Sequence, residues 1–257
     1  MPKFAANLSM MFTEWSLLDR FAAAADHGFQ AVEILFPYAH APDEIAGRLQ
    51  DAKLELALFN LPPGDWEAGE RGLAAIPGRE AAFQAGLQTA LPYAEACAVK
   101  RLHLMSGHGE RADPKAREAY VNAIRHACAV AAPRGIDILI EPINGRDMPG
   151  YFLNDFGYAA ELIRTLGLPN LKLQYDIYHR QILHGDVMRS LEALLPLIGH
   201  VQTSSVPNRH EPGTGELDDA RIFRHLDEIG YEGFVGCEYR PAGGTLDGLS
   251  WMKACDG

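Results

Sequence analysis

Four acidic or amide side chains stand at the ends of four successive β-rich segments in the second half of the sequence. They are Glu141 in 136–141, Asp176 in 171–176, Gln202 in 199–204 and Glu238 in 233–239. Neighbouring strands of a sheet lie about 4.8 Å apart, so side chains from four adjacent strand ends can converge on one point. Three carboxylates and one amide oxygen suit a hard divalent cation, Mg²⁺ or Mn²⁺. Without a cation, the carboxylates would repel one another and raise one another's pKa.

The elements that must position these residues alternate along the chain as they do in an α/β barrel. The β-rich runs are 3–7, 30–36, 54–60, 100–106, 136–141, 171–176, 199–204 and 233–239. The clearest helical stretches are 15–27, 79–97, 114–132, 155–166 and 218–229. We therefore predict one α/β domain over 1–257, a (β/α)8 TIM barrel. An open doubly wound sheet is the alternative, but it usually has fewer strands, and no G-x-G-x-x-G motif follows the first run.

Alternation within the runs indicates which side chains face the barrel interior. In LKLQYD, Lys172, Gln174 and Asp176 share one face, and the apolar residues between them share the other. In GFVGCEY, Glu238 lies on the same face as the small Gly236. Chemistry in such barrels takes place at the carboxyl ends of the strands, so we expect Asp176 and Glu238 to face the mouth of the barrel.

The acidic composition limits the partners that the chain can have. Its 257 residues include 23 Lys+Arg and 34 Asp+Glu, for a formal net charge of -11, which argues against nucleic acid or an anionic membrane. No apolar run approaches the roughly 18 residues that cross a bilayer, the amino terminus lacks the order of a secretion signal, and no cysteine pair has C-x-x-C spacing. We expect a cytoplasmic protein that binds a small molecule. Barrels of this size often pair, so a homo-oligomer is a further expectation.

Seven segments carry a family resemblance. They are FAANLSMMFTE (4–14), GDWEAGERGLAAIPGRE (64–80), EPIN (141–144), PGYFL (149–153), LKLQYDIYH (171–179), HEPGTGE (210–216) and GCEY (236–239). On these segments the chain resembles the hydroxypyruvate isomerase family, within the wider group of xylose-isomerase-like barrels, essentially from end to end. Close relatives act on 2-oxotetronate by the same type of chemistry. The resemblance therefore implies a reaction type and leaves hydroxypyruvate and 2-oxotetronate both open as the substrate.

The resemblance also implies roles for individual residues. Glu141 and Glu238 match the two glutamates taken as proton donor and acceptor. Together with Asp176 and Gln202 they match the metal-ligand set of related barrels. His179 matches a histidine that contacts the substrate in relatives. Related ketose epimerases usually have His where Gln202 stands, and an amide oxygen is a weaker and harder ligand than imidazole.

The implied reaction sets further requirements. Interconversion of hydroxypyruvate and tartronate semialdehyde moves a proton between adjacent carbons through an enediolate. This needs a base, an acid and a positive centre for the oxyanion, which Glu141, Glu238 and a divalent ion would supply. The substrate carboxylate needs a cation, and Arg is the best geometric match. The candidates are Arg71, in the long loop 61–78 that we expect to act as a lid, and Arg209.

Two asparagines and one histidine lie near the predicted mouth without a settled role. Asn7 and Asn60 end the first and third strands, where they either bond substrate hydroxyls or serve as structural amides. His103, on the fourth strand, faces either the barrel or the helices and is left outside the ligand set.

Other functions fit the same barrel. A ketose 3-epimerase or a sugar dehydratase would act on neutral sugars, which need fewer cations than an acid does. A metal-dependent nuclease of the abasic-site type would need several His ligands and a basic groove, and the net charge counts against it. A non-catalytic binding barrel would keep its function with Glu141→Gln, whereas an isomerase would lose several orders of magnitude in rate.

Overall fold

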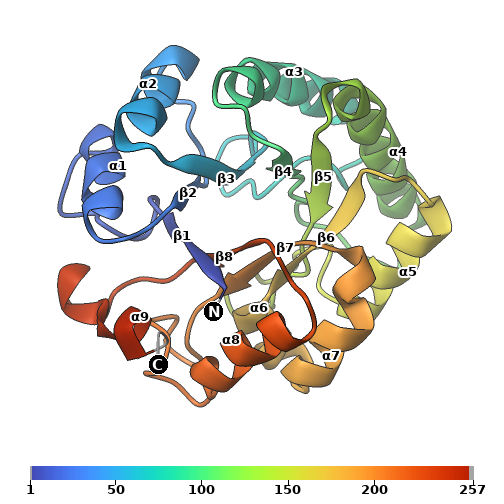
Figure 1. Cartoon of the computed structure of the whole chain (residues 1–257). Helices are drawn as coiled ribbons and strands as arrows, with labels where there is room; N and C mark the ends of the chain where they lie inside the picture. Colours follow the sequence, from blue (N-terminus) through green and yellow to red (C-terminus); the bar gives the residue numbers. More distant parts are fainter. Residues whose placement is uncertain (1, 255–257) are drawn as a thin grey trace.

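Eight parallel strands close into a barrel in the computed structural model of the chain, which describes residues 2–254 (Figure 1). Each strand pairs with the next in sequence, and β8 closes the barrel against β1. The strands are β1 Lys3–Asn7, β2 Ala31–Ile34, β3 Glu55–Asn60, β4 Arg101–His103, β5 Asp137–Ile140, β6 Leu171–Asp176, β7 Ile198–Thr203 and β8 Phe234–Cys237. The predicted TIM barrel is confirmed.

Helices surround the barrel as an outer ring (Figure 1). They are α1 Leu17–Asp26, α2 Pro42–Ala52, α3 Glu80–Ala96, α4 Pro114–Ala131, α5 Phe156–Leu166, α6 Ile177–Leu183, α7 Val187–Leu194, α8 Asp219–Glu228 and α9 Ser250–Ala254. The five helical stretches predicted from the sequence are α1, α3, α4, α5 and α8, and their ends differ by at most two residues. Within residues 2–254, no helix is long and apolar enough to cross a bilayer.

Side-chain caps start several helices and fix the direction of nearby groups. The carboxylate of Asp113 accepts a hydrogen bond from the backbone N–H of Lys115 at 2.9 Å, and Pro114 occupies the first turn of α4. Asp176 ends β6 and also caps α6, because its Oδ1 accepts from the N–H of Tyr178 at 2.8 Å. This cap holds one oxygen of Asp176 and leaves the other facing the barrel mouth.

The two faces of β6 separate apolar from polar side chains, as the alternation predicts. Leu171, Leu173 and Tyr175 are buried in the layer between strands and helices, where the Tyr175 ring lies 5.2 Å from that of Phe156 on α5. The residues between them point into the barrel. The same division places Asp176 on the face of β6 that points into the mouth of the barrel, where it also caps α6.

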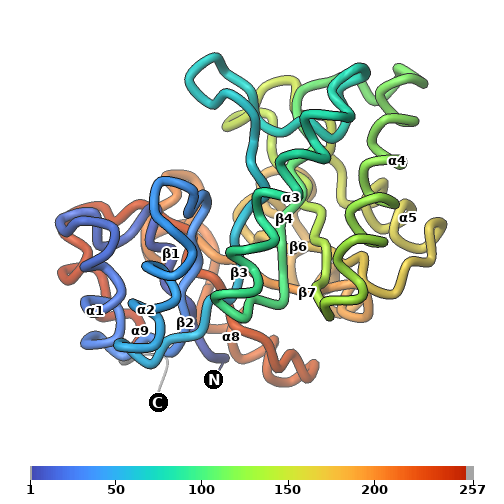
Figure 2. The backbone as a smooth tube through the Cα atoms, turned by 90° about the horizontal axis from the view of Figure 1, so that it is seen from above, coloured from blue at the N-terminus to red at the C-terminus, as the bar shows by residue number. Residues whose placement is uncertain are grey.

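The segment 61–78 joins β3 to α3 without a helix and extends well beyond the strands (Figure 2). Its base is held by an ion pair between Glu70 and Arg79 and by a bridge between Gly72 and Ser106. Gly72 has a φ of 116°, and a Cβ there would collide with the carbonyl of Met105. The loop is therefore fixed at its base while its tip overhangs the mouth.

Candidate active site

A cavity of about 480 Å³ opens at the carboxyl ends of the strands. Six of the predicted site residues line it, namely Asn60, Arg71, Glu141, His179, Arg209 and Glu238. The other three predicted residues, Asn7, Asp176 and Gln202, are fully buried and stand beside or beneath this group rather than on the cavity wall.

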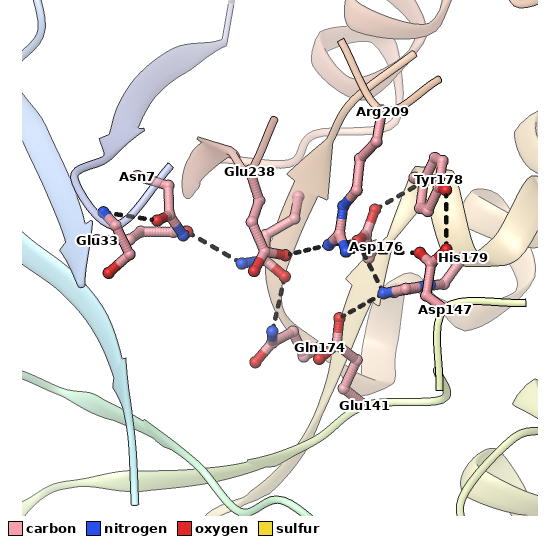
Figure 3. Close-up of polar contacts among 12 residues, drawn as sticks. Asn7, Glu33, Glu141, Asp147, Gln174, Asp176, Tyr178, His179, Arg209 and Glu238 are labelled. Carbon is pink, nitrogen blue, oxygen red and sulfur yellow. Dashed lines mark hydrogen bonds and ion pairs between the residues drawn. The ribbon is translucent and has the colours of Figure 1, made fainter. Parts of the chain in front are cut away.

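Two carboxylates and an imidazole form the most compact polar group of the site. One ligand atom from each of Glu141, Asp176 and His179 lies within 4.8 Å of the others. The Nε2 of His179 is 3.5 Å from Oδ2 of Asp176 and 3.9 Å from Oε1 of Glu141 (Figure 3). Among the described residues, nothing forms a hydrogen bond to Oε1 of Glu141, although this atom is buried. Such a buried oxygen without a partner fits a site for a cation.

Arg209 brings a positive charge to the same place from the loop after β7. Its Nη2 lies 2.9 Å from Oε2 of Glu238 and 3.5 Å from Oδ2 of Asp176, and its Nη1 lies 3.6 Å from Oδ2 of Asp147 (Figure 3). Its guanidinium carbon lies 4.9 Å from the centre of the Tyr178 ring. The backbone of Arg209 has a φ of 58°, an uncommon conformation for a residue with a side chain. The charge of Arg209 is therefore shared among the site carboxylates.

Burial shifts the protonation of these acids towards the neutral form. Burial raises the pKa of Glu238 to about 8, and neighbouring Arg209 offsets only part of this effect. Burial raises the pKa of Asp176 to about 6, again against the influence of Arg209. The pKa of Glu141 is raised well above its usual range by burial and by the charges of Glu238 and Asp176. Groups with pKa values moved towards neutrality can both donate and accept protons near pH 7.

Gln202 lies at the level of Asp176, because the two residues are register partners of β7 and β6. Its Nε2 donates to Oε2 of Glu33 at 3.0 Å, and its Oε1 accepts from Nε2 of Gln174 at 2.6 Å. These two contacts fix which end of the amide is oxygen and which is nitrogen. A cation would bind the amide through its oxygen, and the Oε1 of Gln202 already accepts one hydrogen bond, that from Gln174.

Glu33 of β2 crosses the barrel interior and connects several strands. Its carboxylate also accepts from Nδ2 of Asn7 at 3.2 Å and contacts Nε2 of His200. A Cβ on Gly236 of β8 would collide with this carboxylate, so the glycine leaves room for it. Asn7 is thus held by Glu33 on one side, while its Oδ1 accepts from the N–H of Ser9 on the other. The structure places Asn7 in this interior group, away from the cavity wall.

His103, which the sequence analysis left outside the ligand set, also lines the cavity. Its Nε2 lies 3.6 Å from Oε2 of Glu141, and its Nδ1 lies 3.3 Å from Oδ1 of Asn60. Burial lowers the pKa of His103 to about 3, so the imidazole is neutral at pH 7. Its strand is only three residues long, too short for alternation to indicate its face.

Arg71 stands at the outer wall of the cavity, on the loop after β3. Its guanidinium carbon lies 3.7 Å from the centre of the Trp66 ring, and its Nη1 donates to the carbonyls of Trp66 and Glu70. The side chain is thus positioned by its own loop, and among the described residues it forms no ion pair with a carboxylate. This geometry leaves its charge available to a ligand in the cavity.

Comparison with known proteins agrees with this fold. The profile of the xylose isomerase-like TIM barrel family matches residues 21–255. The chain belongs to this family.

Two of the proteins to which the chain is similar are isomerases by name. The 2-oxo-tetronate isomerase of Cupriavidus necator is 51% identical over 257 residues, covering 98% of both chains. The hydroxypyruvate isomerase of Escherichia coli K12 is 42% identical over 254 residues, again covering 98% of both. A crystal structure from Brucella melitensis, described as an AP endonuclease of family 2, is 48% identical, covers 99% of both chains and superposes with a TM-score of 0.96.

Proposed function

We propose that this chain is an isomerase of short hydroxy-oxo acids that interconverts hydroxypyruvate and tartronate semialdehyde. The observation that carries the proposal is the pair Glu141 and Glu238. Both line one cavity, both are buried, and the pKa of each is raised by that burial. A pair of carboxyl groups in this state can take a proton from one carbon and return a proton to its neighbour.

The reaction follows from where the carbonyl lies. In hydroxypyruvate, C2 is the carbonyl carbon and C3 carries the hydroxyl. One glutamate removes a proton from C3, and the electron pair forms the C2–C3 double bond of an enediolate. The other glutamate supplies a proton to C2, and the hydroxyl proton passes from the C3 oxygen to the C2 oxygen, so that C3 becomes the carbonyl carbon and C2 carries the hydroxyl. In the reverse direction the roles of Glu141 and Glu238 exchange.

A divalent cation, Mg²⁺ or Mn²⁺, is the cofactor that we propose for this site. Glu141, Asp176, Gln202 and Glu238 would hold it. The buried Oε1 of Glu141, which accepts no hydrogen bond from the described residues, supports this assignment. When bound, the ion would stabilise the negative charge that develops on the substrate oxygens. Its positive charge would also lower the pKa values that burial raises in the three acids.

The substrate carboxylate requires its own cation, and Arg71 fits better than Arg209. The guanidinium of Arg209 already contacts Glu238 and Asp176, whereas Arg71 is held over Trp66 and pairs with no carboxylate within residues 2–254. We propose that Arg71 binds the acid group and that Arg209 lies against the reacting carbons.

Two further residues complete the proposed substrate site. His179 and Asn60 face the cavity and would bond the substrate oxygens. Asn7, for which the sequence analysis left a contact with the substrate open, would act only through Glu33, whose carboxylate it contacts.

The four-carbon acid 2-oxo-tetronate is the second candidate substrate. The named 2-oxo-tetronate isomerase is 51% identical to this chain, against 42% for the named hydroxypyruvate isomerase. The reaction at C2 and C3 is the same, and the cavity of about 480 Å³ has room for the additional hydroxymethyl group.

A substrate panel tests the proposal. Hydroxypyruvate, 2-oxo-tetronate, D-fructose and a duplex with an abasic site are each incubated with the protein at fixed Mg²⁺ or Mn²⁺ and again with chelator. Conversion of either acid, lost with chelator, is the expected result. Conversion of D-fructose alone would instead establish a sugar epimerase or isomerase, and cleavage of the duplex alone would establish a nuclease.

A further inference from the structure

Asn144 follows Glu141 by three residues and lies fully buried beside the site. Its Oδ1 accepts hydrogen bonds from two backbone N–H groups, those of Arg146 at 2.9 Å and Asp147 at 3.0 Å. Because only the carbonyl end of an amide can accept, these two donors determine its orientation. The Nδ2 end must therefore point the other way, towards His179.

Two donors from Asn144 converge on one nitrogen of His179. The amide Nδ2 lies 2.7 Å from Nδ1 of His179, and the backbone N–H of Asn144 points at the same atom from 3.4 Å. A ring nitrogen that receives hydrogen bonds offers its lone pair and carries no proton. The single proton of the neutral imidazole is then on Nε2.

The Nε2 of His179 is the atom that faces the reacting groups. It lies 3.5 Å from Oδ2 of Asp176 and 3.9 Å from Oε1 of Glu141 (Figure 3). An Nε2 that carries a proton can donate to an oxygen, but it has no lone pair for a cation. The compact group of Glu141, Asp176 and His179 thus contains two ligands and one donor.

We propose that Asn144 is a positioning residue that fixes His179 in the Nε2–H tautomer, which makes His179 a hydrogen-bond donor to substrate oxygen and excludes it as a metal ligand. The tautomer itself follows from the contacts of Asn144. Its use in catalysis rests on the proposed isomerase function. There the Nε2–H would stabilise the oxyanion of the enediolate, which carries more negative charge than the substrate carbonyl does.

The protonation of the ring can be measured without any reaction. Protein labelled with ¹⁵N at histidine is studied by NMR in the presence of chelator, and the His179 signals are assigned by their loss in His179→Gln. We expect a protonated Nε2 and an unprotonated Nδ1 in the wild-type protein. A proton on Nδ1 of His179 would overturn the proposal. This result is independent of activity, so it separates failure of the tautomer from failure of the proposed function.

Asn144→Asp tests the role of Asn144 with nearly unchanged size. A carboxylate oxygen replaces the amide nitrogen opposite Nδ1, so it accepts where the amide donated, and the ring proton should move to Nδ1. We expect kcat to fall about 10- to 100-fold, with a smaller change in KM, because the lost donor acts mainly in the transition state. A His179 spectrum unchanged from wild type would show that Asn144 does not set the tautomer.

Asn170→Asp is the matched control, because it makes the same chemical change at an asparagine away from the site. The Nδ2 of Asn170 donates to the carbonyls of Cys128 and Ile136 at the amino end of β6, opposite the site. The substitution removes these two partly buried hydrogen bonds but should leave both the His179 signals and kcat unchanged. A move of the His179 ring proton to Nδ1 in this variant would contradict the proposal that Asn144 sets the tautomer.

Discussion

The guanidinium of Arg209 lies between the carboxylates of Asp176, at the end of β6, and Glu238, directly after β8, with its Nη2 2.9 Å from Oε2 of Glu238 and 3.5 Å from Oδ2 of Asp176. The attraction of Glu238 and Asp176 outweighs burial and raises the pKa of Arg209. Arg209 therefore provides positive charge to the acids that are also proposed to hold a divalent cation. The free energy of unfolding of the metal-free protein should therefore depend on the positive charge of Arg209.

Removing that guanidinium should destabilise the metal-free protein. In Arg209→Met, Glu238 and Asp176 lose their buried cation, and we expect the free energy of unfolding in chelator to fall by about 1–3 kcal/mol. Addition of Mn²⁺ should restore more stability to this variant than to wild type. Urea denaturation measures both quantities.

Arg111→Met is the control for this experiment. Arg111 also pairs with an acid, Asp155 at 3.8 Å, but both side chains are partly exposed. Surface pairs contribute little, so we expect a change below about 1 kcal/mol and no effect of Mn²⁺. An equal loss in both variants would mean that the position of Arg209 among the acids has no special effect.

The stability of the metal-free protein should fall as pH rises through neutrality. The pKa of Glu238 is about 8 in the folded chain against about 4.5 ordinarily, so between these values the folded chain keeps a proton that the unfolded chain releases. Stability is then fully present at low pH and is lost as pH rises towards 8, by on the order of 3 kcal/mol. Unfolding in chelator from pH 5 to pH 8.5 measures this slope.

Glu238→Gln should flatten the same curve, because glutamine does not titrate. The part of the slope that remains belongs to Glu141 and Asp176, whose pKa values are also raised by burial. A wild-type curve that rises between pH 5 and pH 8 would contradict the assigned direction of the pKa shift.

Asp176→Asn should weaken cation binding by at least about tenfold, because it removes a charge while asparagine retains the ability to cap α6. Calorimetric titration with Mn²⁺ measures the affinity. Asp155→Asn is the matched control, since Asp155 caps α5 through the N–H of Tyr158 at 2.7 Å in the same way. Equal affinities of the two variants would remove Asp176 from the proposed ligand set.

Arg71→Met should raise KM for the acid substrate by about 10- to 100-fold and change kcat much less. This size is expected because a hydrogen bond to a charged group contributes ~1.5–3 kcal/mol to binding. Arg71→Lys keeps the positive charge but lacks the planar guanidinium, so its KM should lie between those of the wild type and Arg71→Met. Steady-state kinetics with hydroxypyruvate and 2-oxo-tetronate measure the change. An unaltered KM in Arg71→Met would assign the substrate carboxylate to another cation.

The sequence was sufficient for the barrel because its signals are local and repeated. Asp113 with Pro114 predicts the start of α4, and alternation in LKLQYD predicts the two faces of β6, as observed. Four helices gave no comparable signal. Of these, α6 and α7 are only seven and eight residues long and follow one another directly between β6 and β7, where tertiary contacts determine their bounds.

The site was only partly predictable, because its side chains are organised by contacts that are distant in sequence. Glu141 and Glu238 could be proposed from their strand ends alone. The neighbours of Glu33 could not, since His200 lies 167 residues away and Gln202 lies 169 away. Asn144 was visible in the EPIN segment, but its role depends on which way its amide faces.

Exchange of substrate hydrogen with solvent deuterium tests the central proposal most directly. Hydroxypyruvate is incubated in D₂O with the cation, and deuterium at C3 is followed by NMR for wild type, Glu141→Gln, Glu238→Gln and the exposed control Glu161→Gln. We predict rapid exchange in wild type and in Glu161→Gln, and losses of about 10²- to 10⁴-fold in the other two variants. Exchange at the wild-type rate in either Glu141→Gln or Glu238→Gln would contradict the assignment of that residue to proton transfer.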